Sequence, residues 1–261
     1  MNQFATTAVY YHRFRPGIPP EVAELLMNEA NRCSRATILF DLGTGTGQVI
    51  TAIHRHFRDI IAVDPDPEMV KFARLVAGSA ISPETTLSFY TCRAEVVSPP
   101  PGWKASLVTI CRAFHWMEQD RVLQRLSSFV PPSGVVAKLG DRSFWTAGNP
   151  WQQAVRQVIQ DFLGEQRRAG EGVFLHNNFT FAEILEKSPF CKIEEVTIPV
   201  HRIWNVESIL GYLYSTSFAA RPLFGDRIEE FGATLKASLA NYSDIDTFHE
   251  GNAFTIMFGR R

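Results

Sequence analysis

A glycine-rich turn near the start of this 261-residue chain is the feature most able to do chemistry. Gly43, Gly45 and Gly47 stand at alternate positions, beginning two residues after Asp41, between an apolar run and a segment with helical spacing. Glycines let the backbone approach a ligand closely, and the first N–H groups of a helix point toward that ligand. A plain tight turn needs only one or two glycines, so the spacing predicts a ligand site.

The spacing also separates classes of nucleotide-like ligand. A dinucleotide-binding turn has glycines at its first, third and sixth positions, and the sixth position counted from Gly43 is Gln48. The carboxylate of Asp41 would repel a pyrophosphate and attract a ligand that carries an ammonium group. An NAD(P)-dependent reductase is therefore disfavoured and is kept as a second hypothesis.

A second carboxylate lies where a nucleoside ligand would need one. Residues 59–64 form an apolar run that ends in Asp64, which follows Gly43 by 21 residues. An acidic side chain about 20 residues after such a turn meets ribose hydroxyls in nucleotide-binding βαβ units. The alternative is that Asp64 caps the next helix, although Asp66, directly before Pro67, suits that role better.

The elements that must position these residues alternate along the chain. Expected strands cover residues 37–40, 59–64, 86–91, 105–111, 135–139, 192–200 and 253–258. Expected helices cover residues 19–29, 67–77, 120–129, 151–163, 180–187, 206–214 and 228–239. This alternation predicts an α/β fold with a parallel sheet and helices on both faces, and a ligand beyond the carboxyl ends of the strands.

The order and spacing of the expected elements also predict that the chain divides into four segments. Residues 1–30 form an N-terminal lid segment and helix, residues 31–145 a cofactor-binding α/β core, residues 146–190 a helical insertion, and residues 191–261 the last strands with a helical cap insertion at 204–241. The aromatic residues of the cap are expected either to line a pocket or to pack as core. They are Trp204, Tyr212, Tyr214, Phe218 and Phe224.

The glycine turn resembles motif I of the class I S-adenosylmethionine-dependent methyltransferases, an acidic residue and any residue before Gly-x-Gly-x-Gly. Ala94-Glu95, the Ala-Phe-His-Trp run at 113–116 and the aromatic-rich Arg-Pro-Gly segment at 10–17 resemble the small-molecule branch. That branch includes trans-aconitate and ubiquinone-type enzymes and antibiotic-pathway N-methyltransferases. The resemblance covers residues 8–140 in motif order. It departs at Ile18, where several relatives have a tyrosine.

The resemblance implies a doubly wound, mostly parallel, seven-stranded Rossmann-like sheet with helical cap insertions, and S-adenosyl-L-methionine as cofactor. The implied cofactor-binding residues are Arg13, Asp41, Gly43, Thr44, Gly45, Gly47, Asp64, Pro65, Met69, Ala94, Glu95, Cys111, Arg112 and Ala113. The implied acceptor-binding residues are Tyr10, Tyr11, Phe114, Trp116 and Tyr212. Residues 10–15 are expected to close over the cofactor as a lid, with Arg13 or Arg15 near its carboxylate; the alternative is a surface arm.

His115 is the candidate base, with Tyr10 as a second catalytic candidate near the methyl group; a hydrogen-bonded structural role for His115 is the alternative. An alcohol acceptor needs a base, whereas an amine that binds neutral needs mostly positioning. The expected reaction is methyl transfer to nitrogen or oxygen of a small molecule such as a natural-product intermediate, and the resemblance favours nitrogen. A protein repurposed as a cyclase or as a cofactor-binding subunit is a further alternative.

Composition narrows the partners. The net charge is −1, so no basic field would gather nucleic acid, and no apolar run reaches the ~20 residues of a membrane helix. The four cysteines form no C-x-x-C pair, and His54 and His56 do not share a helix face, so no metal site is expected. We expect a cytoplasmic monomer or homodimer.

Overall fold

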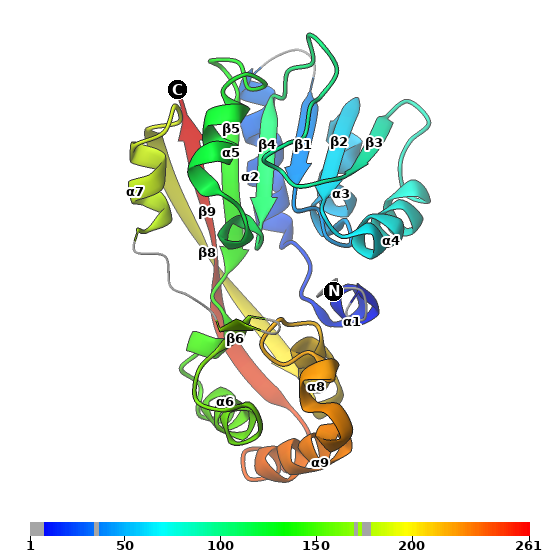
Figure 1. The fold of residues 1–261 in the computed structure, drawn as a ribbon, viewed down its shortest axis with the longest axis vertical. Coiled ribbons are helices and arrows are strands. Elements are labelled where there is room, and N and C mark those ends of the chain that lie inside the picture. Colours follow the sequence, from blue (N-terminus) through cyan, green and yellow to red (C-terminus); the bar gives the residue numbers. More distant parts are fainter. Residues whose placement is uncertain (1–7, 34–36, 170–171, 174–178) are drawn as a thin grey trace. The chain divides into compact units, whose positions relative to one another are not determined.

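The computed structural model describes residues 8–33, 37–169, 172–173 and 179–261 of the chain. The chain divides into two compact units, each described here by itself (Figure 1). The sheet unit comprises Gly17–Asp141, Asn177–Ile198 and Phe254–Arg261. The helical unit comprises Met1–Pro16, Arg142–His176 and Pro199–Ala253.

A seven-stranded sheet with the strand order β3-β2-β1-β4-β5-β9-β8 organises the sheet unit (Figure 1). The first five strands pair in parallel, and β9 runs antiparallel to β5. The strands are β1 (Ile38–Leu42), β2 (Asp59–Asp64), β3 (Thr86–Thr91), β4 (Leu107–Cys111), β5 (Val135–Asp141), β8 (Lys192–Trp204) and β9 (Phe248–Arg260). Strands β8 and β9 contribute residues to both units.

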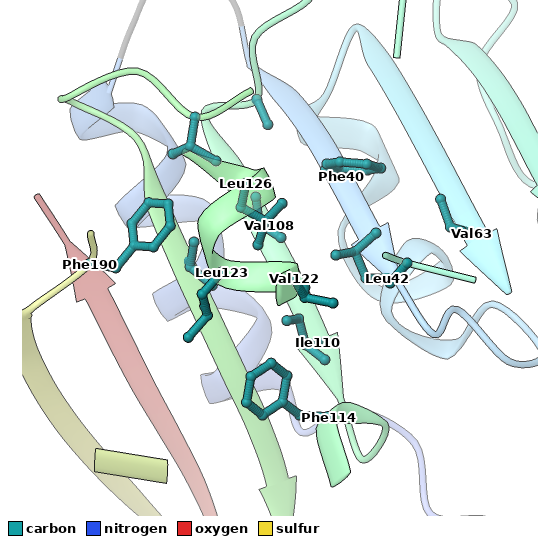
Figure 2. Close-up of a cluster of buried hydrophobic side chains, with 14 of the residues drawn as sticks. Phe40, Leu42, Val63, Val108, Ile110, Phe114, Val122, Leu123, Leu126 and Phe190 are labelled. Carbon is teal, nitrogen blue, oxygen red and sulfur yellow. The ribbon is translucent and has the colours of Figure 1, made fainter. Parts of the chain in front are cut away.

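The sheet unit has helices on both faces, with α5 and α2 on opposite sides (Figure 1). Its helices are α2 (Pro20–Cys33), α3 (Gln48–Ile53), α4 (Pro67–Gly78), α5 (Gln119–Leu126) and α7 (Phe181–Glu186), with short 3₁₀ turns at His54–His56 and Phe114–Trp116. Side chains from the strands and from α5 make one buried cluster, in which Ile110, Phe114 and Val122 lie together (Figure 2). Burial of such side chains contributes roughly 1.5–3 kcal/mol each.

The helical unit is built on aromatic packing. Its elements are α1 (Ala8–Phe14), α6 (Pro150–Leu163), α8 (Val206–Tyr214), α9 (Ile228–Leu239), 3₁₀ turns at Phe144–Thr146 and Arg221–Arg227, and the two-residue strands β6 (Arg168–Ala169) and β7 (Gly172–Val173). Tyr212 and Tyr214 are buried in one core with Trp204, Phe218 and Phe224. These five aromatics therefore pack as core.

The predicted seven-stranded, mostly parallel fold class is confirmed, and the strand at 86–91 has the predicted bounds. Several elements differ from the prediction. Residues 8–14 are helical because Phe14 packs on α8, a contact that local sequence does not reveal. Strand β9 begins at Phe248 instead of residue 253, and the β6–β7 pair was not predicted because two residues leave no periodicity. Among the described residues, no helix has the length and apolar character needed to cross a membrane.

Gly211 gives the test of how α1 is held in the helical unit. A Cβ at Gly211 would lie 2.2–2.5 Å from ring atoms of Phe14, whereas a Cβ at Gly232, in α9, would meet only the Tyr214 hydroxyl at 3.8 Å. Gly211→Ala should lower the free energy of unfolding by about 1–3 kcal/mol through overpacking. Gly232→Ala should raise it by roughly 0.5–1 kcal/mol, the helix-propensity gain. Denaturant titration measures both; a stabilised Gly211→Ala protein would contradict the packing of Phe14 on α8.

Candidate functional site

The sheet reverses its direction of growth at β1, and the candidate site lies at that point. From β1 the chain adds β2 and β3 on one side and β4 and β5 on the other. Ligands of open α/β sheets bind at the carboxyl ends of the strands where the order reverses. The parallel register places Asp41 of β1 beside Ala62 of β2 and Thr109 of β4. The carboxyl ends of β1, β2 and β4 therefore meet at one edge.

The glycine turn crosses this edge with left-handed backbone at all three glycines. Their φ values are 70° at Gly43, 53° at Gly45 and 83° at Gly47, which L side chains rarely adopt. The N–H groups of Gly43 and Thr44 donate to the Val63 carbonyl at 2.8 and 3.0 Å. A Cβ at Gly43 would lie 2.3 Å from the Ala113 Cβ, so this glycine lets the turn after β1 touch the loop after β4.

The Asp41 carboxylate is buried and is held by two hydroxyl groups. Thr109 donates to Oδ1 at 2.6 Å and Thr44 donates to Oδ2 at 2.7 Å. Burial raises the pKa of Asp41 from 3.8 to about 6, and the two hydroxyl hydrogen bonds lower it in part. Thr44 therefore ties the turn to the carboxylate, and Thr109 ties β4 to it.

Asp64, at the end of β2, is the second buried carboxylate of the edge. Its Oδ2 accepts the Gly45 N–H and its Oδ1 accepts the Asp66 N–H, both at 2.9 Å. Burial raises the pKa of Asp64 to about 6, against the effect of these two N–H groups. The cap of α4 is Asp66, whose Oδ1 accepts the Glu68 N–H at 2.8 Å, as the sequence favoured.

The groups at the turn fit a nucleoside with a cationic amino-acid tail. The Thr46 hydroxyl, between Gly45 and Gly47, is buried without a hydrogen-bond partner among the described residues. A buried hydroxyl normally has a partner, so the turn retains capacity for one more polar contact. The two Asp64 oxygens have about four acceptor positions, of which the backbone uses two, leaving capacity for hydroxyls. Sequence reasoning missed Thr46; its place between two glycines was the available signal.

The loop after β3 holds its acidic residue in internal contacts. Glu95 is buried, accepts the Glu118 N–H at 2.7 Å and pairs with Arg93 at 3.2 Å. Burial alone would raise the pKa of Glu95, but these hydrogen bonds lower it below its ordinary value. Ala94 and Met69 are buried, and Pro65 is exposed. The cofactor contacts that the resemblance implies for these three residues stay predictions.

The loop after β4 divides its aromatic residues between core and surface. Phe114 is buried with its ring 4.7 Å from Phe181, edge to face, so we propose no acceptor contact for it (Figure 2). His115 and Trp116 are exposed, with ring centroids 5.0 Å apart. Burial raises the pKa of the Cys111 thiol to about 12, which favours the protonated thiol at neutral pH.

Arg112 makes a contact at this edge that the sequence did not reveal. Its guanidinium Nε donates to Asp141 Oδ1 at 2.8 Å, and its Nη1 donates to Gln48 Oε1 at 3.0 Å. Asp141 thus forms an ion pair with Arg112, and the described residues contain no cluster of metal-ligating side chains.

The remaining predicted residues lie in the helical unit. The Tyr10 hydroxyl accepts from Arg221 at 2.8 Å, and Arg13 pairs with Glu207 at 2.7 Å at the surface. Tyr11 and Tyr212 each have the Arg15 guanidinium over their ring, at 5.0 and 4.8 Å. Their roles in a lid or acceptor site stay predictions.

Asp41 yields a prediction on pH dependence. The unfolded carboxyl loses its proton near pH 3.8 and the folded one near pH 6, so stability falls as pH rises across this window and is lower by about 3 kcal/mol above it. Asp41→Asn removes the buried charge but keeps one acceptor, so at pH 8 it should stabilise the protein by about 1–2 kcal/mol, with little gain at pH 4. Denaturant titrations at both values measure this.

The control for this measurement is Asp226→Asn, which removes an exposed carboxylate in the helical unit. Such a surface change should stay within about 0.5 kcal/mol of the parent at both pH values. An Asp41→Asn protein that is less stable than the parent at pH 8 would show that the threonine hydroxyls fully offset the cost of burying the charge.

Comparisons with known proteins agree with this geometry. Residues 39–134 match the family model described as a methyltransferase domain. The chain is 31% identical over 131 residues to an uncharacterized methyltransferase of Mycobacterium tuberculosis, which covers 50% of this chain and 49% of that protein. It is 26% identical over 218 residues, 80% of each chain, to an uncharacterized methyltransferase of Schizosaccharomyces pombe. The chain thus spans about half the length of the mycobacterial relatives it matches.

Solved structures share the fold at low identity. A candidate type II methyltransferase of Anaeromyxobacter dehalogenans superposes with a TM-score of 0.61 and 19% identity, covering 95% of this chain and 98% of that one. A candidate methyltransferase from an antibiotic biosynthesis pathway of Anabaena variabilis gives 0.61 and 16%, covering 93% and 98%. Residues 39–134 are thus similar to a methyltransferase domain, and the chain has the Rossmann-like fold of the class I methyltransferases.

Proposed function

We propose that this protein is an S-adenosylmethionine-dependent methyltransferase that acts on nitrogen or oxygen of a small molecule. The observation that carries the proposal is the three-glycine turn between the buried carboxylates of Asp41 and Asp64, at the point where the sheet reverses its direction of growth. Such a turn suits a ligand that combines ribose hydroxyls with a cationic tail. The methyltransferase domain match at residues 39–134 supports the same class.

The chain's own residues have separate tasks in this proposal. Asp64 would accept hydroxyl hydrogen bonds from the ribose while it fixes Gly45, and Asp41 would hold the turn through Thr44. Bound S-adenosylmethionine supplies a methyl group activated by the sulfonium. His115 and Trp116, exposed on the loop after β4, would meet the acceptor, with His115 taking a proton from a hydroxyl acceptor and Trp116 lying against a cationic or sugar-like one.

Nitrogen is the favoured acceptor atom. The support is the resemblance to antibiotic-pathway N-methyltransferases together with the shared fold of the Anabaena variabilis protein, a candidate methyltransferase from an antibiotic biosynthesis pathway. The lid role of residues 10–15 stays part of the same proposal. Cytoplasmic location and a monomeric or homodimeric state stay expectations.

The experiment that tests this function is a transfer assay with methyl-labelled S-adenosylmethionine and a panel of small amines, alcohols and carboxylic acids. Labelled product identified by mass would establish the reaction and the acceptor atom. Cofactor binding by calorimetry without any labelled product across the panel would favour the repurposed cyclase or binding subunit. Absence of cofactor binding in the parent protein would reject both.

Cofactor binding should depend on Asp64 and not on its neighbour Asp66. Asp64→Ala removes hydrogen bonds to a carboxylate and should weaken S-adenosylmethionine binding by about 1.5–3 kcal/mol, roughly 10- to 150-fold. Asp66→Ala removes the cap of α4 and should cost about 1 kcal/mol of folding stability, with the affinity within about threefold of the parent. Calorimetry and denaturant titration on both variants separate the roles; equal losses of affinity would contradict ribose binding by Asp64.

His115 should report the acceptor atom. With a hydroxyl acceptor, His115→Ala should lower kcat by at least ~10²-fold, the loss typical of a missing general base. With an amine acceptor the loss should be smaller, and Trp116→Ala should raise KM. The matched control is His56→Ala, a half-buried histidine in another 3₁₀ turn of the sheet unit. Parent kinetics in both His115→Ala and Trp116→Ala would remove this loop from the acceptor site.

A further inference from the structure

Arg112 has a backbone conformation that is unusual for its residue type. It has φ 54°, one of two left-handed non-glycine residues among those described, and it directly follows β4. Left-handed backbone is unfavourable for a residue with a Cβ and persists only where the surroundings hold it. The N–H of Arg112 donates to the Leu139 carbonyl of β5 at 2.9 Å.

The side chain of Arg112 is held on three of its atoms. Its Nε and Nη2 donate to the two carboxylate oxygens of Asp141 at 2.8 and 3.1 Å, and its Nη1 donates to Gln48 Oε1 at 3.0 Å. The Arg112 and Asp141 side chains are only 9% and 13% exposed. Gln48 is the first residue of α3, directly after Gly47. One planar group therefore joins the ends of β4 and β5 to the end of the glycine turn.

The surroundings leave a space that matches this side chain. A Cβ at Gly140 would lie 3.3 Å from the Arg112 Cγ, so the glycine of β5 makes room for the arginine stem. The Phe254 ring of β9 lies 5.5 Å from the guanidinium carbon. A buried ion pair is by itself a weak stabiliser, because desolvation offsets the attraction. Its clearer effect is geometric, since a bidentate contact with a carboxylate fixes orientation as well as distance.

We propose that Arg112 is a positioning residue, which holds the loop with His115 and Trp116 at a fixed place relative to the glycine turn. The contacts with Asp141 and Gln48 set the backbone three and four residues before the two exposed rings. For its effect on the reaction rate, the inference rests on the proposed function. A misplacement of about 1 Å in a bound substrate can lower the rate by about 10²-fold. Lysine cannot replace this arginine, because an ammonium lacks the planar fork that makes three directed contacts.

Amide hydrogen exchange on the ligand-free protein tests the positioning without any assumption about the reaction. Arg112→Lys and Gln48→Met should speed exchange of the amides of residues 113–117 by at least about tenfold, while the amides of β1 and β4 stay within about twofold. The control is Arg227→Lys, which breaks an equally bidentate contact with Glu230 that is exposed in the helical unit. It should leave residues 113–117 unchanged.

Two results would overturn the inference. One is unchanged exchange of residues 113–117 in both variants. The other is an equal rise over the whole sheet, which would make Arg112 a residue of global stability. If the parent does not bind S-adenosylhomocysteine, the proposed function is rejected. The comparison of amide exchange between the parent and the variants still tests the positioning role of Arg112.

If the parent transfers methyl groups, Arg112→Lys should lower kcat by about 10- to 100-fold while the Kd for S-adenosylhomocysteine changes less than about threefold. An equal loss in both quantities would assign Arg112 to cofactor binding and overturn the positioning role. Asp141→Asn should also lower kcat more than it changes the Kd, but by a smaller factor than Arg112→Lys. The amide oxygen can still accept one of the two guanidinium hydrogen bonds.

Discussion

Two carboxylates buried at the ends of neighbouring strands set the constraint on which this sheet edge depends. Charge in a poorly solvated place is unfavourable unless hydrogen bonds compensate it, and the pKa values of Asp41 and Asp64, both about 6, reflect that cost. The compensation comes from the Thr44 and Thr109 hydroxyls and from backbone N–H groups. A turn that brings an N–H back to Asp64 needs left-handed backbone at Gly45, which explains the residue type there.

Several groups at this edge are unfavourable for the folding stability of the protein. The edge includes two partly compensated buried carboxylates, a threonine hydroxyl that has no hydrogen-bond partner among the described residues, and an arginine with left-handed backbone. Such departures from local rules concentrate at functional sites. The turn that follows Asp41 touches the loop after β4 through Gly43 and Ala113, and Arg112 at the start of that loop donates to Gln48 at the end of the turn.

The helical unit also contains a buried carboxylate, and hydrogen bonds within the unit compensate its charge. Its buried Glu250 accepts Trp204 Nε1 at 2.8 Å, Asn252 Nδ2 at 2.8 Å and Gln152 Nε2 at 3.2 Å, with Arg202 at 3.6 Å. A carboxylate with several donors on both oxygens needs no further partner. The five aromatic residues of the expected cap pocket pack in the core of this unit. Core packing is the alternative that the sequence left open for them.

The sequence by itself determined the order of strands and helices, the glycine turn with its two carboxylates and the Asp66 cap, because periodicity, turn chemistry and caps act over a few residues. Only the tertiary structure decided that Phe114 faces the core while His115 and Trp116 face outward, and that residues 8–14 fold as a helix against α8. It alone joined Arg112 to Gln48 and Asp141, 64 and 29 positions away. Those contacts depend on strand register and on how loops meet at a shared edge, and neither leaves a pattern in neighbouring residues.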